Sequence, residues 1–294
     1  MKPKVLIAIY LGILIAVFGV MLFAAAQQKS FWEDEVFTAS YAGQSADTLS
    51  ELAAWDVHPP MYLFMARWWG QRFGFDEIGL RSLSILFAII AVLLTYKLSL
   101  DLLGRSSALV ATTLTAFLPL LVMYGHNARY YSLAVALAVL AAFTMFRFTH
   151  PTHILFLLAY IATGTVFLYL IYAAASVLIA CNLWWMIRWA IKKEARSIWS
   201  LLMWIAAQAV IIFLYLPGLR QLTTVTGRFS QLQAVDNWLV EIVKRAAYLG
   251  YVASVGETIS PLNPLAWLGI LAVVGLCVFA IIRNWKSLNF PSQI

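Results

Sequence analysis

The sequence predicts an all-α integral membrane protein of about eight transmembrane helices, and three observations lead to this expectation. The 294 residues are 63% hydrophobic and only 11% charged, whereas a soluble domain has roughly 25% charged residues. Apolar runs long enough to cross a bilayer recur along the chain. The basic residues that give the net charge of +7 lie mostly at the ends of these runs. There they orient membrane helices, so nucleic acid is not an expected partner.

The first apolar run extends from Val5 to Ala26 and carries no charge. Lys2 and Lys4 precede it, and Ala24-Ala25-Ala26 resembles a signal-peptide cleavage site. The run is nevertheless longer than the roughly 7–15 residues of a signal-peptide core. We therefore expect a helix that is retained in the membrane.

The other predicted spans follow from hydropathy and length. The run Ile154–Ile187 contains no charge, and one helix of that length, at about 1.5 Å per residue, would far exceed a hydrocarbon core of roughly 30 Å. We expect two helices with a reversal near Tyr169–Ala175, which also puts the basic segment Arg188–Arg196 on the cytoplasmic side with the N-terminus. The full set after the first run is Ile78–Leu100, Ser106–Met123, Tyr130–Phe146, two helices in Ile154–Ile187, Ile198–Leu216 and Leu265–Ile282.

We expect one transmembrane domain over residues 1–294, with two long extracytoplasmic segments at 27–77 and 217–264. In the first segment, Pro59-Pro60 precedes a stretch rich in Trp, Tyr and Phe from Met61 to Phe75. Such a stretch is typical of a helix that lies in the membrane interface. In the second, the amphipathic spacing of Asp236–Tyr251 predicts another helix.

Three consecutive acids, Glu33, Asp34 and Glu35, lie just beyond the first span between Phe31-Trp32 and Val36-Phe37. They could simply solvate a loop. A carboxylate held against aromatic surface at a membrane edge is costly without a partner, however, which favours a functional site. Because consecutive residues point in different directions, we expect one carboxylate to face a reacting group while its neighbours bind, orient or face water.

Basic and aromatic residues recur at the same level of the membrane. His58 follows Asp56 and precedes two prolines that prevent a helix from running through it. Arg81 lies in the outer turn of the second span, and Arg129 opens the fourth within a cluster of Tyr, His and Asn. Arginines at helix ends often snorkel to headgroups. The rich surroundings of Arg129 favour a bound lipid phosphate instead, because a guanidinium fork suits phosphate oxygens.

Together these motifs resemble those of the polyprenyl-phosphate-sugar-dependent glycosyltransferases of the GT-C fold, above all the branch of protein O-mannosyltransferases and the aminoarabinose transferase of lipid A. The resemblance covers residues 5–150 and, by hydropathy and the Val255-Gly256-Glu257-Thr258 turn, the rest. His126-Asn127 stands where the family more often has Gln-Glu. Members are usually longer, so this chain is expected to be a fragment or a minimal version. The segments that carry the resemblance are Trp32 to Glu35, His58 to Tyr62, Phe75 to Ser82 and Tyr124 to Tyr131.

The resemblance implies inverting transfer of a sugar from a polyprenyl-phosphate donor to a lipid, glycan or protein acceptor on the extracytoplasmic face. By position, Asp34 matches the family's catalytic Asp, and Arg129 matches the Arg that meets the donor phosphate. We further expect Glu35 beside Asp34 in catalysis, and Arg81, His58, His126 and Tyr130 beside Arg129 at the phosphate. The residues expected at the acceptor or substrate are Glu33, Asp56, Tyr124 and Glu257.

The lipid-linked donor needs no nucleotide, and the chain has no glycine-rich phosphate loop. A divalent cation, held in part by Glu35, stays open, because no set of metal ligands is identifiable. Two other functions also stay open: a carrier or flippase for a lipid-linked substrate, and a non-catalytic subunit of a membrane assembly. A carrier would have charges at mid-bilayer and two related halves, and neither is present in the sequence.

Overall fold

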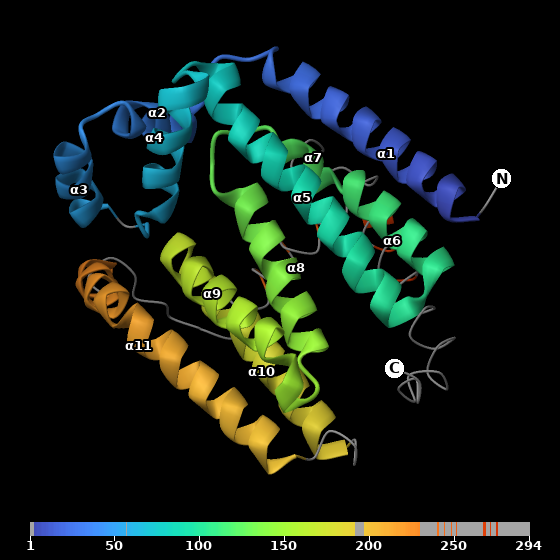
Figure 1. The fold of residues 1–294 in the computed structure, drawn as a ribbon. Helices are drawn as coiled ribbons and strands as arrows, with labels where there is room; N and C mark the ends of the chain where they lie inside the picture. Colours follow the sequence, from blue (N-terminus) through green and yellow to red (C-terminus); the bar gives the residue numbers. More distant parts are fainter. Residues whose placement is uncertain are drawn as a thin grey trace. The chain divides into compact units, whose positions relative to one another are not determined.

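The computed structural model describes residues 3–56, 58–191 and 197–229, together with single residues between 240 and 275. Within this part of the chain the secondary structure is entirely helical (Figure 1), which confirms the predicted all-α class. The elements are α1 (Pro3–Ala26), α2 (Glu33–Ala42), α3 (Ala46–Trp55), α4 (Met61–Phe73), α5 (Glu77–Leu103), α6 (Arg105–Ala116), α7 (Pro119–Tyr124), α8 (Tyr131–Arg147), the 3₁₀ turn η1 (Pro151–His153), α9 (Ile154–Leu170), α10 (Ala174–Ile191) and α11 (Ile198–Phe229).

Five helices in the described ranges are long and apolar enough to cross a membrane. The predicted reversal within the long uncharged run is confirmed, because α9 ends at Leu170 and α10 begins at Ala174. Helix α8 is also apolar but shorter. The five are Lys4–Ala26, Glu77–Leu103, Pro151–Leu170, Ala174–Ile191 and Ile198–Leu219.

The predicted single span Ser106–Met123 is wrong. Helix α6 ends at Ala116 and α7 begins at Pro119. The proline has no N–H for the helical ladder and disfavours helical geometry in the residue before it, so it ends one helix and starts another. Pro217 does not end its helix: α11 continues through this residue to Phe229. The described start of the loop predicted at 217–264 is therefore helical.

The chain forms two compact units. The first comprises the described residues up to Phe117 and from Tyr124 to Phe229, and the second includes Leu118–Met123. The helix predicted at Asp236–Tyr251 and the span predicted at Leu265–Ile282 lie outside the described residues, apart from single positions. The elements discussed below belong to the first unit.

Helix α5 is central to the first unit, where it packs against α1, α6 and α8 (Figure 1). Helix α8 in turn contacts α9 and α10, and α9 contacts α11. Near the start of α5 the core contains Leu80 and Leu83 with Leu133 of α8. Toward the other end, Trp185 and Trp204 stack with ring centroids 4.7 Å apart. Apolar side chains thus join the spans along their length, and within a membrane it is their close packing that stabilises these contacts.

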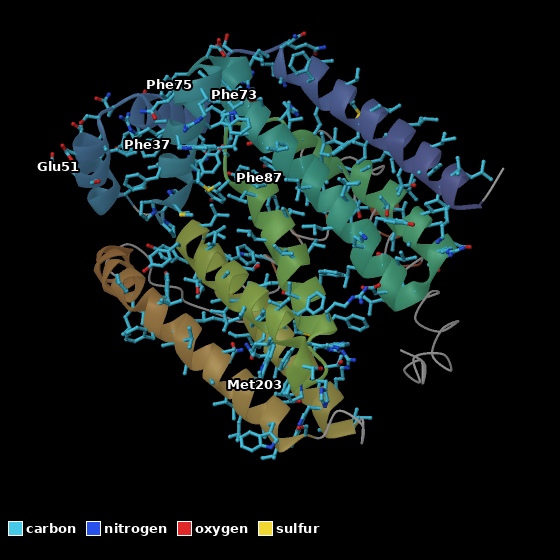
Figure 2. The ribbon with its side chains drawn as sticks, viewed as in Figure 1. Phe37, Glu51, Phe73, Phe75, Phe87 and Met203 are labelled. Carbon is cyan, nitrogen blue, oxygen red and sulfur yellow. The ribbon has the colours of Figure 1, made fainter. Side chains whose placement is uncertain are left out.

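The short helices α2, α3 and α4 gather at the end of the bundle where α1 ends and α5 begins (Figure 1). Helix α4, predicted from its aromatic residues, buries Tyr62 and Ala66 but exposes Trp68 and Phe73. Figure 2 labels Phe73. The guanidinium of Arg72 lies over the Trp68 ring at 4.0 Å. One face of α4 therefore contacts the core, and the other presents rings suited to a membrane interface.

A tight turn fixes the start of α5. Gly74 has φ +96°, a conformation that favours glycine. Asp76 caps the helix by accepting a hydrogen bond from Gly79 N at 2.6 Å. The backbone passes so close here that a Cβ on Gly79 would lie 2.3 Å from the Gly74 carbonyl oxygen. This turn sets the position of Arg81, which follows Gly79 by two residues in α5.

Candidate active site

The first feature of the site is a buried ion pair between Glu35 of α2 and Arg81 of α5. The Glu35 side chain is fully buried, and that of Arg81 is 3% exposed. Two parallel bonds join them, from Nε to Oε1 at 2.9 Å and from Nη2 to Oε2 at 2.6 Å. A two-point contact of this kind is the strongest and most directional form of a charged hydrogen bond.

The remaining donors of Arg81 bind the chain that follows α1. They donate to the carbonyl oxygens of Ala26, Lys29 and Ser30 at 2.6–3.0 Å. A guanidinium has five N–H donors, and these contacts with Glu35 use all of them. Arg81 therefore has no donor left for the lipid phosphate for which the sequence suggested it, and its contacts instead tie the end of α1 to α2 and α5.

Glu35 also holds two backbone amides. Its Oε2 accepts from Trp32 N at 3.2 Å, which caps the start of α2. Its Oε1 accepts from Ala128 N at 2.7 Å. Ala128 directly precedes Arg129, so the buried carboxylate fixes the backbone next to the arginine predicted to bind phosphate.

A second contact holds Arg129 from its other side. Ser84 of α5 donates to the Arg129 carbonyl oxygen at 3.1 Å, and the Tyr62 hydroxyl lies 3.4 Å from Ser84 Oγ. Burial raises the pKa of the Tyr62 phenol far above its ordinary value, so this hydroxyl stays protonated. Neither contact could be inferred from the local sequence, because each joins positions far apart along the chain.

These supports bring Arg129 beside Asp34. Arg129 Nε lies 3.8 Å from Asp34 Oδ2, with the Arg129 side chain 6% exposed and the Asp34 side chain 42% exposed. Nη1 donates weakly to the Asp34 carbonyl and to Thr38 Oγ1, both at 3.3 Å. Nε is buried and has no hydrogen-bond partner among the described residues. A buried cationic donor without a hydrogen-bond partner is costly and is suited to binding an anion.

Aromatic rings extend the site beyond Arg129. The Arg129 guanidinium lies 5.3 Å from the Tyr130 ring, which is in turn 4.8 Å from Tyr131 and 6.0 Å from the ring of His58. Burial raises the pKa of Tyr130, and Tyr131 adds to the increase. The Tyr130 hydroxyl therefore stays a neutral donor next to the cation.

His58 leads to a further carboxylate. His58 Nδ1 and the His58 backbone N each lie 3.2 Å from Asp56 Oδ1. The Asp56 side chain is 7% exposed and that of His58 is 43% exposed. A continuous path of polar side chains thus runs from Asp34 through Arg129, Tyr130 and His58 to Asp56.

The other predicted site residues lie differently. Glu33 is exposed at the start of α2, while Tyr124 and His126 are half-buried in the segment before Arg129. Glu257 lies outside the described residues. For the divalent cation that the sequence left open, the described ranges bring together no group of three His, Cys, Asp or Glu side chains that could hold a metal ion.

Comparison with known proteins identifies the family. The model of the dolichyl-phosphate-mannose-protein mannosyltransferases matches residues 57–220, more than half of the chain. The match includes His58, Arg81 and Arg129, and Asp34 and Glu35 precede it. No curated protein and no solved structure gives a match. With its apolar helices and this match, the chain belongs to the dolichyl-phosphate-mannose-protein mannosyltransferase family of GT-C membrane glycosyltransferases.

Proposed function

We propose that this membrane glycosyltransferase moves a sugar from a polyprenyl-phosphate donor to a lipid, glycan or protein acceptor. The observation that carries the proposal is the pairing of a partly exposed carboxylate, Asp34, with a buried and incompletely paired guanidinium, Arg129, at 3.8 Å. The first group suits a proton acceptor and the second suits a phosphate. Both chemistries are needed for the transfer.

In the proposed reaction, Asp34 accepts the proton of the acceptor hydroxyl as that oxygen attacks the anomeric carbon. The bond from this carbon to the phosphate oxygen breaks, and its electron pair leaves with the phosphate. Attack from the face opposite the phosphate inverts the anomeric centre. Asp34 and Arg129 are too close for a sugar to lie between them, so the anomeric carbon lies beside the pair.

Arg129 stabilises the charge that grows on the departing phosphate. This attraction is stronger in the transition state than in the ground state, because the phosphate then carries more negative charge. Tyr130, whose raised pKa keeps its hydroxyl protonated, supplies a neutral donor beside the guanidinium. Glu35 and Arg81 touch only protein groups in this scheme. We assign them a positioning role, in place of the catalytic and phosphate-binding roles inferred from sequence.

The charge distribution supports a site on the extracytoplasmic face. The site lies where α1 ends and where α5 and α8 begin. The opposite ends of these helices carry basic residues, namely Lys4 in α1, Lys97 in α5 and Arg147 in α8. Because basic residues favour the cytoplasmic side, the site is expected at the extracytoplasmic face of the membrane. There, polyprenyl-linked sugars would reach it from the bilayer.

A transfer assay tests the proposal. Purified protein in lipid vesicles is incubated with polyprenyl-phosphate mannose labelled in the sugar and with a membrane extract. We expect label in an acceptor with the wild-type protein and with Glu51→Gln, an exposed control on α3 (Figure 2). Asp34→Asn should transfer label at least about a hundredfold more slowly. Label that crosses the vesicle membrane while still on its lipid would instead indicate a carrier. If Asp34→Asn and the wild-type protein both support another enzyme's transfer without transferring themselves, the chain is a non-catalytic subunit.

A further inference from the structure

The turn between α9 and α10 brings a tyrosine into the site that the sequence had not suggested. Tyr172 lies between the end of α9 at Leu170 and the start of α10 at Ala174. Its ring is half-buried, but its hydroxyl oxygen is fully buried and has no hydrogen-bond partner among the described residues. A buried phenol usually has a hydrogen-bond partner. A phenol without one at a candidate site therefore indicates that a bound ligand would supply the partner.

The two helix ends that flank Tyr172 pack at the site, because Leu170 and Ala174 belong to the same core cluster as Ala128, which precedes Arg129, and Tyr130 packs against that cluster. Burial raises the pKa of the Tyr172 phenol, and the negative charge of Asp56 adds to the increase, so the two groups are within electrostatic range. Asp56 is almost buried and holds His58 through the two 3.2 Å contacts. The turn between α9 and α10 supplies the phenol, and Asp56 and His58 supply a carboxylate and an imidazole, with the Tyr130 ring next to His58.

These side chains have the chemistry that recognises sugars. A carboxylate accepts hydrogen bonds from hydroxyl groups, and an imidazole or a neutral phenol both donates and accepts. None of the three carries the fixed positive charge that a phosphate needs. Arg129 supplies that charge, and the rings of Tyr130 and His58 separate it from Asp56.

We propose that Tyr172, Asp56 and His58 bind the hydroxyl groups of the sugar on the lipid donor. The proposal rests on the proposed function, because it takes Arg129 as the group that meets the phosphate. A sugar bonded directly to that phosphate extends along the surface next to Arg129, and Tyr130 and His58 provide the path to the buried Tyr172 hydroxyl. Tyr172 and Asp56 then select among donors by the hydroxyls that they satisfy.

Binding measurements test this without requiring turnover. The wild-type protein is titrated with sugar-free polyprenyl phosphate and with polyprenyl phosphates carrying mannose, glucose or galactose. We expect one sugar-linked lipid to bind more tightly than the sugar-free lipid. The variant Tyr172→Phe, which removes only the hydroxyl, should lower the affinity for that lipid by about three- to tenfold, the effect of one neutral hydrogen bond. It should leave the affinity for the sugar-free lipid unchanged. Asp56→Asn should act in the same direction.

Tyr169→Phe is the matched control. This tyrosine lies one turn earlier, and its hydroxyl already donates to the Leu214 carbonyl at 3.0 Å, so its loss should not alter the difference between the two kinds of lipid. If Tyr172→Phe lowers the affinity for sugar-linked and sugar-free lipids equally, or lowers neither, the sugar subsite is overturned while the proposed function stands. A wild-type protein that binds none of these lipids overturns both.

Discussion

Asp34 and Glu35 are consecutive residues in opposite environments. The side chain of Asp34 is 42% exposed beside Arg129, whereas that of Glu35 is fully buried against Arg81. One helix, α2, therefore supplies an accessible carboxylate for chemistry and an inaccessible one for structure. Glu35 contacts Ala128 and Asp34 contacts Arg129, so two adjacent acids meet two adjacent residues of a distant segment, and the buried contact fixes the geometry of the exposed one.

Glu35→Ala is expected to destabilise the fold. Removing one partner of a buried ion pair leaves the other charge uncompensated, which costs about 3–5 kcal/mol. We expect a clear decrease in the unfolding temperature of the purified protein in detergent. Glu51→Ala, an exposed acid on α3, should unfold like the wild type. An unfolding temperature unchanged by Glu35→Ala would refute the structural role of the pair.

Gly79→Ala is expected to disturb the same region through the backbone. The added Cβ would meet the Gly74 carbonyl oxygen at 2.3 Å and the Phe73 carbonyl oxygen at 2.6 Å, and overpacking of this kind costs about 1–3 kcal/mol. Thermal unfolding measures the loss. Gly12→Ala in α1 is the control, because a Cβ there meets nothing within 4 Å. If both variants unfold at the wild-type temperature, the turn has room for a Cβ at Gly79 and does not constrain the start of α5.

Ser84→Ala is expected to slow transfer more than it weakens donor binding. It removes the hydrogen bond that holds the Arg129 carbonyl, and a small displacement of a catalytic group can reduce the rate by about tenfold to a hundredfold. Steady-state kinetics with varied donor would show a fall in kcat with a smaller change in KM. Ser99→Ala, at a buried position near the other end of α5, should leave both constants unchanged, and an equal loss in both variants would count against positioning.

Arg129→Lys is expected to weaken donor binding although it keeps the charge. The ammonium has no planar fork and cannot place a donor where the buried Nε lies. Titration with sugar-free polyprenyl phosphate should show lower affinity than wild type, with Arg129→Ala weaker still. Arg105→Lys, exposed at the start of α6, provides the reference. Wild-type affinity in Arg129→Lys would mean that the phosphate binds elsewhere.

Much of this architecture is accessible from the sequence, where a local pattern decides it. The uncharged run Ile154–Ile187 is too long for one helix, and the structure ends α9 at Leu170. The proline pair at 59–60 and the aromatic stretch after it predict α4. Four motifs in order predict the family that the comparison shows. Pro119 also carried a local signal, since it ends the helix that hydropathy alone had extended to Met123.

The inward direction of Glu35 was less accessible. The spacing of Glu35, Thr38 and Ala42 places them on one face of a helix, and the structure buries all three. That signal existed but required α2 itself to be predicted, and the three acids of its first turn, although favourable at a helix N-terminus, are equally compatible with a loop. The contacts of Arg81, Ser84 and Tyr172 had no signal of this kind, because each depends on how distant helices pack. A single sequence shows the residue types but not these pairings.

Asp34 is proposed to act on the acceptor beside a phosphate held by Arg129, and Asp34→Asn is the decisive variant when donor binding and the rate of transfer are measured on the same preparation. The substitution keeps the shape of the side chain and removes its capacity to accept a proton. We expect a rate of transfer lower by about a hundredfold to ten-thousandfold, with donor affinity equal to or tighter than that of the wild type because Arg129 loses its acidic neighbour. Transfer at the wild-type rate by Asp34→Asn would show that Asp34 is not the base.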